Sequence, residues 1–321
     1  MKDLFNRETD YMRISITDRC NLRCKYCMPE EGIEKVPMSR ILTYEEILSI
    51  CEAAVSLGII KFKVTGGEPL VRKGCAGFCK ELKRITGVEQ VTLTTNGQML
   101  ETIIPELADA GIDGINISMD SMSAGRYRNI TGGGELERTI RGIEAAAGSS
   151  IKTKINCLIQ RGFNDDELMD FADLAFERGL DVRFIEIMPI GYGKPDMGVS
   201  NALLLERLKE RWPQLTADNA VHGNGPAVYY TLPGRKGAIG LISPMHDCFC
   251  DRCNRIRLTS QGMIKPCLCY EDSIDLRPAL EEGRIETIKT ALIKAVLSKP
   301  AGHTFENKDS VERRSMVEIG G

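Results

Sequence analysis

The chain has 321 residues, more than the roughly 250 to 300 at which a single hydrophobic core stops growing, so we expect one large domain with an appendage. Apolar residues make up 42% and charged residues 27%, which excludes a disordered or fibrous protein. The 42 Lys and Arg nearly balance the 45 Asp and Glu, and the net charge of -3 argues against a nucleic-acid or membrane-surface partner.

The N-terminal segment gives no sign of export. Met1 to Asp10 is charged and lacks the apolar core of a secretion signal, and no apolar run reaches the roughly 18 residues that cross a bilayer. We therefore expect a cytoplasmic protein. Because that compartment is reducing, the 12 cysteines are interpreted as metal or redox ligands rather than disulfides, and 3 histidines are few for a His-rich zinc enzyme.

Between Asp10 and about Trp212, short β-branched runs alternate with helical patterns, which is typical of parallel strands joined by helices. The predicted strands are Tyr11 to Thr17, Ile59 to Thr65, Gln90 to Thr95, Gly114 to Met119, Ile151 to Leu158 and Asp181 to Ile187. The predicted helices are Thr43 to Leu57, Cys75 to Ile85, Glu101 to Ala110, Glu135 to Ala147, Asp165 to Arg178 and Asn201 to Arg211. We expect residues 1–215 to form the core domain and residues 216–321 a C-terminal domain.

One face of the first five predicted strands is polar throughout. A doubly wound sheet is covered by helices on both faces and should be apolar on both, so the pattern favours a partial (β/α)6 TIM-like barrel with a wet lumen. The last strand departs from the pattern, because Arg183 shares its face with Ile185 and Ile187. An antiparallel sheet with one solvated side is the alternative, which the interleaved helices disfavour.

The first cysteine group is Cys20-Asn-Leu-Arg-Cys24-Lys-Tyr-Cys27, directly after the first strand, at the end where parallel barrels place their active sites. Three thiolates on a cubane iron-sulfur cluster leave one iron without a protein ligand, and an open iron is a place for chemistry. Three buried structural thiols are the alternative. The charged residues around the group argue against a core position.

The spacing of these cysteines, with Tyr26 before the last one, resembles the signature of the radical S-adenosylmethionine (SAM) superfamily. The segment Thr65-Gly66-Gly67-Glu68-Pro69 resembles the second motif of that superfamily. The resemblance implies a [4Fe-4S] cluster on Cys20, Cys24 and Cys27, with methionine of SAM on the open iron and the Gly66-Gly67 backbone at its amino group. Glycine also suits a close ligand, because it has no Cβ.

The second cysteine group is Cys248-Phe-Cys250-Asp-Arg-Cys253, followed by Cys267-Leu-Cys269. Four thiolates, from Cys250, Cys253, Cys267 and Cys269, could form a closed structural zinc site. A cluster held by the first three of these alone would instead have a second open iron. The spacing does not decide between the two interpretations.

The stretch from Cys253 through Arg255 and Arg257 to Gly262, with the terminal Ile319-Gly320-Gly321, resembles the GTP 3',8-cyclase family. The resemblance implies a radical SAM lyase that converts GTP to (8S)-3',8-cyclo-7,8-dihydroguanosine 5'-triphosphate, the first step of molybdenum cofactor biosynthesis. It implies a second [4Fe-4S] cluster on Cys250, Cys253 and Cys267, within a C-terminal extension that closes the lumen. The family's Gly-Gly tail enters the active site.

The same resemblance assigns the remaining site residues. The implied catalytic residues are Cys20, Cys24, Cys27, Arg255 and Arg257. The implied SAM contacts are Tyr26, Gly66, Gly67, Ser118 and Met188. The implied GTP contacts are Arg13, Lys61, Lys63, Thr94, Lys154, Arg183, Arg255, Ile256 and Arg257. The sequence has no P-loop, so cationic side chains must neutralise the triphosphate that the resemblance implies, and the lumen-facing cations of the strands can do so.

Two other functions fit parts of the pattern. A peptide-modifying radical SAM maturase also binds auxiliary clusters in a C-terminal extension, and a non-catalytic zinc-ribbon scaffold would use the C-terminal cysteines to bind a protein. The cyclase assignment implies as partners a flavodoxin- or ferredoxin-like electron donor and a downstream cyclic pyranopterin monophosphate synthase, and it allows a homodimer.

Overall fold

The computed structural model describes residues 1–34, 36–305 and 312–320, and these form one 12-stranded sheet. Its strand order is β12-β11-β10-β1-β2-β3-β4-β5-β6-β9-β8-β7. The strands are β1 (Tyr11–Ser15), β2 (Lys61–Thr65), β3 (Gln90–Thr95), β4 (Gly114–Ser118), β5 (Lys152–Leu158), β6 (Asp181–Ile185), β7 (Thr216–Asp218), β8 (Val228–Thr231), β9 (Ala238–Ile242), β10 (Arg255–Leu258), β11 (Met263–Lys265) and β12 (Ile274–Asp275).

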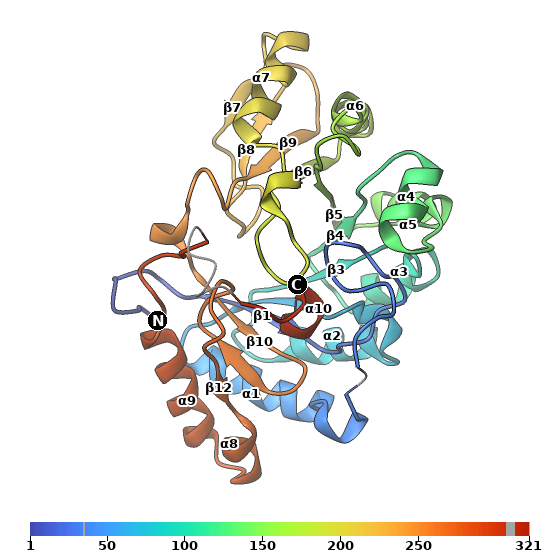
Figure 1. The fold of residues 1–321 in the computed structure, drawn as a ribbon. Coiled ribbons are helices and arrows are strands. Elements are labelled where there is room, and N and C mark those ends of the chain that lie inside the picture. The colour runs from blue at the N-terminus through green and yellow to red at the C-terminus, as the bar shows by residue number, and fades with distance from the viewer. Residues whose placement is uncertain (35, 306–311, 321) are drawn as a thin grey trace.

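Helices cover the outer face of this sheet (Figure 1). The helices of the described chain are α1 (Tyr44–Ser56), α2 (Cys75–Arg84), α3 (Leu100–Asp109), α4 (Ala124–Thr131), α5 (Leu136–Ala147), α6 (Leu168–Arg178), α7 (Asn201–Arg211), α8 (Arg277–Glu281), α9 (Ile285–Leu297) and α10 (Met316–Ile319). Short 3-10 turns are η1 (Met38–Arg40), η2 (Pro69–Val71), η3 (Pro195–Met197) and η4 (Cys250–Arg252). The short α10 lies inside the curve of the sheet, between β1 and the loops that follow β6.

The sheet is a partial barrel, as predicted from the polar strand faces. The six predicted strands are present and parallel in the order β1 to β6. The C-terminal region adds a parallel strand at each edge, β10 beside β1 and β9 beside β6. These two strands were not predicted, and neither was α4. The curved parallel sheet is therefore completed by residues from both halves of the chain.

Alternation along the strands separates an apolar outer face from a polar inner face. Met12, Ile14, Phe62 and Val64 are fully buried in the core between sheet and helices. The residues that alternate with them face the lumen. On neighbouring strands these inner residues lie side by side, so that Arg13 lies between Arg257 on β10 and Lys63 on β2. The polar inner face predicted from sequence is confirmed by this register.

Local sequence signals explain where the first helix begins. The Thr43 side chain accepts a hydrogen bond from Glu46 N, and the Glu46 carboxylate accepts one from Thr43 N, a capping box that satisfies two otherwise unpaired amide donors. The helix then buries Ile47, Ile50 and Cys51 against the outer face of the sheet. Amphipathic spacing and a capped start thus place α1 where the sequence predicted it.

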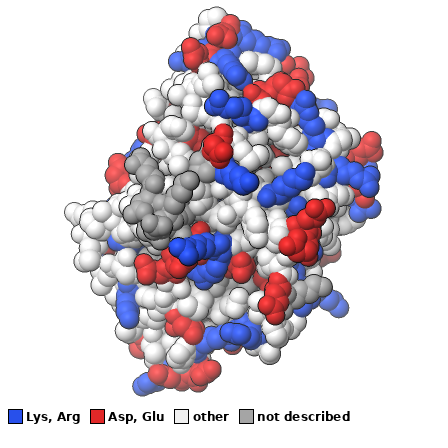
Figure 2. All heavy atoms as spheres, viewed as in Figure 1, with Lys and Arg blue, Asp and Glu red and all other residues white. Residues whose placement is uncertain are grey.

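The outer surface differs in charge from the lumen. On the face in Figure 2, cationic and anionic side chains are interspersed. Many cations on the surface have a carboxylate partner, as in Arg126 with Asp166 and Arg211 with Asp173. Among the described residues, no helix combines the length and the apolar character that crossing a bilayer requires.

Two glycines provide a test of the packing between α6 and β9. A Cβ at Gly237 would lie 1.9 Å from the Ala175 carbonyl oxygen, whereas a Cβ at Gly77, on the exposed side of α2, would meet nothing within 4 Å. We expect Gly237→Ala to lower the free energy of unfolding by about 1 to 3 kcal/mol through overpacking. Gly77→Ala should raise it by about 1 kcal/mol, because alanine favours helix. Urea denaturation measures the free energy of unfolding of both variants. The same change in this free energy for Gly237→Ala and Gly77→Ala would contradict the close packing at Gly237.

Candidate functional site

A cavity of about 370 Å³ occupies the lumen formed by the described residues. It is lined by side chains from the inner face of the strands and by C-terminal residues that cover the opening. Both predicted cysteine trios border it, together with predicted SAM and GTP contacts. These residues are Cys20, Cys24, Cys27, Cys250, Cys253, Cys267, Tyr26, Gly66, Gly67, Ser118, Met188, Arg13, Lys63, Thr94, Arg183, Arg255 and Arg257.

The two trios lie at opposite ends of the paired strands β1 and β10. The strands are parallel, with Tyr11 opposite Arg255, and Cys20 follows β1 while Cys253 precedes β10. Cys267 follows β11, which is antiparallel to β10, and so lies at the same end as Cys253. Because β1 has 5 residues at about 3.3 Å each, the two ends are about 16 Å apart.

The loop that carries the first trio is held by backbone contacts to α4. Arg23 N donates to Thr131 O at 2.8 Å, and Lys25 N donates to Ile130 O at 3.0 Å. Gly132 ends α4 with φ 65°, and a Cβ there would lie 2.7 Å from the Cβ of Arg23. The helix that sequence analysis missed therefore supports the cysteine loop.

The glycine pair after β2 packs directly on the same loop. Gly67 N donates to Thr17 O at 2.7 Å, and a Cβ on Gly67 would lie 2.4 Å from Arg19 O. The sequence suggested glycine here for access of a ligand. The structure adds a second reason, because the close approach of two loops already excludes any side chain at Gly67.

Glu68, which follows the glycines, is a buried carboxylate that the sequence did not single out as a site residue. It accepts hydrogen bonds from Leu70 N, Asn96 N and the Thr95 hydroxyl at 2.7 to 3.0 Å. Burial raises its pKa to about 7, although these three donors lower it. Through these hydrogen bonds, Glu68 connects the segment after β2 with the end of β3.

Tyr26 and Asp120 form a second buried polar contact beside the first trio. The Tyr26 hydroxyl donates to Asp120 Oδ2 at 2.6 Å, and Leu158 N donates to Oδ1 at 2.8 Å. Burial raises the pKa of Asp120 to about 6, although both donors lower it. The aromatic residue of the cysteine motif is therefore fixed in orientation by β4 and β5.

Five cationic side chains line the cavity between the two trios: Arg13, Lys63, Arg183, Arg255 and Arg257. Arg183 donates to Asn116 Oδ1 at 2.7 Å and to Asn156 Oδ1 at 2.8 Å, so neutral amides hold it. Burial, and then repulsion by Arg183 and Arg13, lowers the pKa of Lys63 well below its ordinary value. Such a group of cations is suited to an anion that carries several charges.

Three of the predicted GTP contacts are not among the residues that line the cavity. Lys61 forms an ion pair with Asp10 at 2.6 Å, and Lys154 forms one with Asp181 at 2.7 Å. The Ile256 side chain is fully buried in the apolar core, in register with Met12. Only the backbone of Ile256 is therefore left for the predicted contact, and the roles of both lysines stay predictions.

In the second trio the surroundings of Cys253 suit a thiolate, whereas burial raises the pKa of Cys250 to about 12 and the pKa of Cys267 above its ordinary value. Lys299 Nζ donates to Cys253 Sγ at 3.6 Å, and Cys269 N donates to Cys267 Sγ at 3.5 Å. Burial raises the pKa of Cys253, but Lys299 and Arg255 outweigh it and lower the pKa below its ordinary value. Hydrogen bonds and a nearby cation are what a cluster-bound sulfur requires, so these residues fit an iron-sulfur cluster.

The two extra thiols of this region differ in burial. Cys269 is 1% exposed and packs with Ile190, Phe305 and Ile319 in a small apolar cluster. Cys248 is exposed. The spacing of the cysteines allowed a closed site of four thiolates that includes Cys269. The apolar surroundings of Cys269 disfavour this interpretation.

The C-terminal tail enters the cavity. Met316 and Val317 line it, and the carbonyl of Gly320 accepts a hydrogen bond from Arg257 Nη1 at 3.3 Å. Gly320 has φ 77°, and a Cβ there would lie 2.8 Å from Ser15 Cβ. Gly321, the other residue of the predicted tail, lies outside the described residues.

A buried ion pair holds the segment that leads into this tail. Lys265 on β11 and Glu312 are both fully buried and form a charge-assisted hydrogen bond, while Glu312 N donates to Cys269 O at 2.6 Å. Arg314 Nη2 also donates to the Glu312 carboxylate at 2.7 Å. The path of the tail therefore depends on one carboxylate.

Comparisons with known proteins agree with this arrangement. Residues 14–175 match the radical SAM superfamily, and residues 180–305 match the family described as Molybdenum Cofactor Synthesis C. The chain is 44% identical over 327 residues to a GTP 3',8-cyclase of Alkaliphilus oremlandii, and 42% identical over 323 residues to one of Clostridium perfringens, with 100% of each chain covered in both cases. The chain belongs to the GTP 3',8-cyclase family, within the radical SAM superfamily.

Solved structures support the fold independently. Streptococcus suis SuiB, solved with S-adenosylmethionine bound, superposes with a TM-score of 0.63 at 15% identity. The match covers 87% of this chain and 65% of SuiB. At this identity the likeness concerns the fold alone, and it confirms the partial α/β barrel.

The Lys265–Glu312 pair yields a stability test. Glu312→Gln leaves a buried ammonium group without its counter-ion, so we expect the free energy of unfolding to fall by about 3 to 5 kcal/mol in urea denaturation. Glu286→Gln, which removes an exposed partner of Lys289, should cost less than about 1 kcal/mol. Equal losses of stability in the two variants would contradict a stabilising role for the buried Lys265–Glu312 pair.

The same pair makes a pH prediction. Burial raises the pKa of Glu312, but Arg314 and Lys265 outweigh it, and the pKa lies below its ordinary value of 4.5. The stabilisation by the pair should be complete above pH 4.5 and should decline as the pH falls further. The difference in stability between the parent chain and Glu312→Gln should therefore shrink in acid.

Proposed function

We infer that this chain cyclises GTP to (8S)-3',8-cyclo-7,8-dihydroguanosine 5'-triphosphate by radical SAM chemistry, in the first step of molybdenum cofactor biosynthesis. The observation that carries the inference is one cavity bordered by two cysteine trios at opposite ends, with five cations between them. Relatives of full length bear the name GTP 3',8-cyclase. A nucleoside triphosphate is the kind of substrate that such a cavity accommodates.

The first trio would hold a [4Fe-4S] cluster, with SAM contacted by Tyr26, Gly66, Gly67, Ser118 and Met188. When bound, this cluster supplies the electron that starts radical chemistry on the ribose. The chain contributes a fixed loop geometry, since Asp120 orients Tyr26 and the Gly67 amide is engaged by Thr17. Preorganised positions of this kind lower the entropic cost of bringing reactants together.

The cations would bind the triphosphate, which carries roughly four negative charges, through charge-assisted hydrogen bonds. The proposed contacts are Arg13, Lys63, Thr94, Arg183, Arg255 and Arg257, with Lys61, Lys154 and the Ile256 backbone as outer contacts. Arg255 lies over the Phe249 ring at 5.5 Å, so its guanidinium plane is held beside the second trio. The second [4Fe-4S] cluster, on Cys250, Cys253 and Cys267, would receive the guanine end.

The wider setting is proposed from the same chemistry. Residues 1–215 would act as the radical SAM core and residues 216–321 as the domain that closes the lumen and holds the second cluster. A flavodoxin- or ferredoxin-like donor would supply electrons, and a cyclic pyranopterin monophosphate synthase would consume the product. We place the reaction in the cytoplasm, as a monomer or a homodimer.

The direct test is anaerobic incubation with GTP, SAM and dithionite, followed by mass analysis of the nucleotide. We expect 5'-deoxyadenosine and the cyclised nucleotide, and we expect neither from Cys24→Ala, because a cluster ligand is lost. Cys51→Ala, in the core of α1, should retain both products. Product formed by Cys24→Ala would refute the assignment.

Iron content after reconstitution with iron and sulfide, without added zinc, separates this function from a zinc ribbon. Two clusters require about eight irons per chain, whereas a zinc ribbon beside one cluster leaves about four irons. Two clusters with deoxyadenosine formation that depends on a peptide rather than on GTP would indicate a maturase.

Lys63 provides a test of the cationic lumen. Since arginine stays protonated in proteins and the pKa of Lys63 is lowered, Lys63 is the cation able to gain a proton when the triphosphate arrives. Calorimetry of GTP binding, in buffers with different ionisation enthalpies, should show proton uptake. Lys63→Arg should abolish the uptake and retain affinity, and Lys63→Met should weaken binding about tenfold or more. Unchanged uptake in Lys63→Arg would contradict this role.

A further inference from the structure

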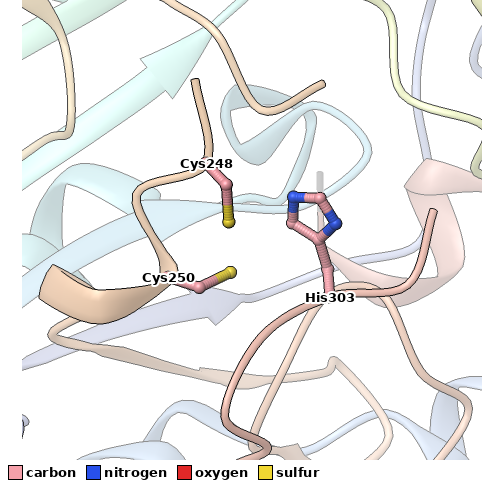
Figure 3. A group of neighbouring side chains, drawn as sticks. All are labelled: Cys248, Cys250 and His303. Carbon is pink, nitrogen blue, oxygen red and sulfur yellow. The ribbon is translucent and has the colours of Figure 1, made fainter. Parts of the chain in front are cut away.

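Three potential metal ligands meet beside the second trio, in a grouping that the proposed function does not use (Figure 3). The ligand atoms of Cys248, Cys250 and His303 all lie within 4.8 Å of one another. Cys248 comes from the loop after β9, Cys250 begins η4, and His303 lies beyond α9. Figure 3 shows the two thiols converging on the imidazole ring.

Ligand atoms that all lie within 4.8 Å of one another are close enough to be drawn onto one metal ion by small side-chain movements. A tetrahedral ion with metal–sulfur distances of about 2.3 Å and a metal–nitrogen distance of about 2.0 Å places its ligand atoms about 3.5 to 3.8 Å apart. Ligands on different irons of a cubane lie farther from one another, because the irons themselves are separated. Cys248 and His303 are therefore arranged for a single ion that also takes Cys250.

The state of His303 points to a ligand as well. Both ring nitrogens are buried, and neither has a hydrogen-bond partner among the described residues. The ring packs on Phe305, with centroids 4.3 Å apart, which fixes its plane. Buried polar atoms without partners are rare in proteins, and a bound cation would satisfy one of these nitrogens.

We propose that Cys248, Cys250 and His303 form a binding site for one divalent ion of the zinc or ferrous type, which excludes the second cluster because both use Cys250. The exposed Cys248 gives the ion access, and water fills its fourth position. Binding releases two thiol protons to solvent and involves no change of oxidation state. The exclusion of the cluster rests on the proposed assignment of Cys250, whereas the ion site does not.

The test uses the full chain with Cys20, Cys24 and Cys27 all changed to Ser, so that the first trio cannot bind metal. Anaerobic titration with Co²⁺ should give one ion per chain, with thiolate charge-transfer absorption and the visible bands of tetrahedral cobalt. In this background, Cys248→Ser and His303→Gln should each weaken binding by about tenfold or more. Cys253→Ser and Cys269→Ala are the matched controls and should retain both affinity and spectrum.

Each outcome decides the proposal. Binding that needs Cys253 or Cys269 but tolerates Cys248→Ser and His303→Gln would overturn it, as would the absence of stoichiometric binding. Thermal unfolding of each variant separates loss of a ligand from loss of the fold. Competition of Zn²⁺ and Fe²⁺ against Co²⁺ then identifies the preferred ion.

A second measurement addresses the competition with the cluster. Wild-type chain reconstituted with iron and sulfide in the presence of Zn²⁺ should hold about four irons and one zinc, and Cys248→Ser should recover about eight irons. Eight irons in both proteins would overturn the exclusion. If two clusters never form even without zinc, the proposed cofactor assignment fails, while the cobalt titration still tests the ion site.

Discussion

The candidate site depends on like charges that are buried together on the inner face of the sheet. Arg13, Lys63, Arg183, Arg255 and Arg257 line a single cavity, and burial together with mutual repulsion lowers the pKa values of Lys63, Arg13 and Arg257. The strands can hold this arrangement because every second side chain belongs to an apolar core on the outer face. Burial of the apolar outer face thus stabilises the fold, and the cations of the inner face remain available to bind an anion.

The parallel pairing of β10 with β1 connects the two halves of the candidate site. It places Arg255 and Arg257 in the same wall as Arg13, and it sends the two cysteine trios to opposite ends. An antiparallel pairing would have brought both trios to the same end and left no span for a nucleotide between them. The direction of one strand therefore decides whether two clusters can act on a single substrate.

Much of this could be predicted from sequence, because alternation in long strands and clustered cysteines are local signals. Alternation predicted a polar face on the first five strands, and Arg13, Lys63 and Thr94 lie on this face in the cavity wall. The ion pairs Lys61–Asp10 and Lys154–Asp181 were not predicted. The two partners of each pair lie on or beside neighbouring strands and are far apart in sequence, so no local pattern brings them together. Strands β9 and β10 were missed because they lie outside the strand-helix repeat that ends near Trp212, in a region rich in turns and cysteines. The alternation of Arg255 and Arg257 with Ile256 and Leu258 was the available signal.

The tail shows how a chain end becomes part of a cavity wall. Residues 316–320 would fray if left in solvent, since four residues of helix have little stability of their own. A capping box at Ser315 and Glu318 satisfies the start of α10, and the buried Lys265–Glu312 pair fixes the chain before it. The Gly320 carbonyl can then meet Arg257 deep in the lumen, where a side chain would collide with Ser15. The tail thereby gives one of the five cations a neutral partner, and a polyanionic substrate could displace this contact without having to break an ion pair.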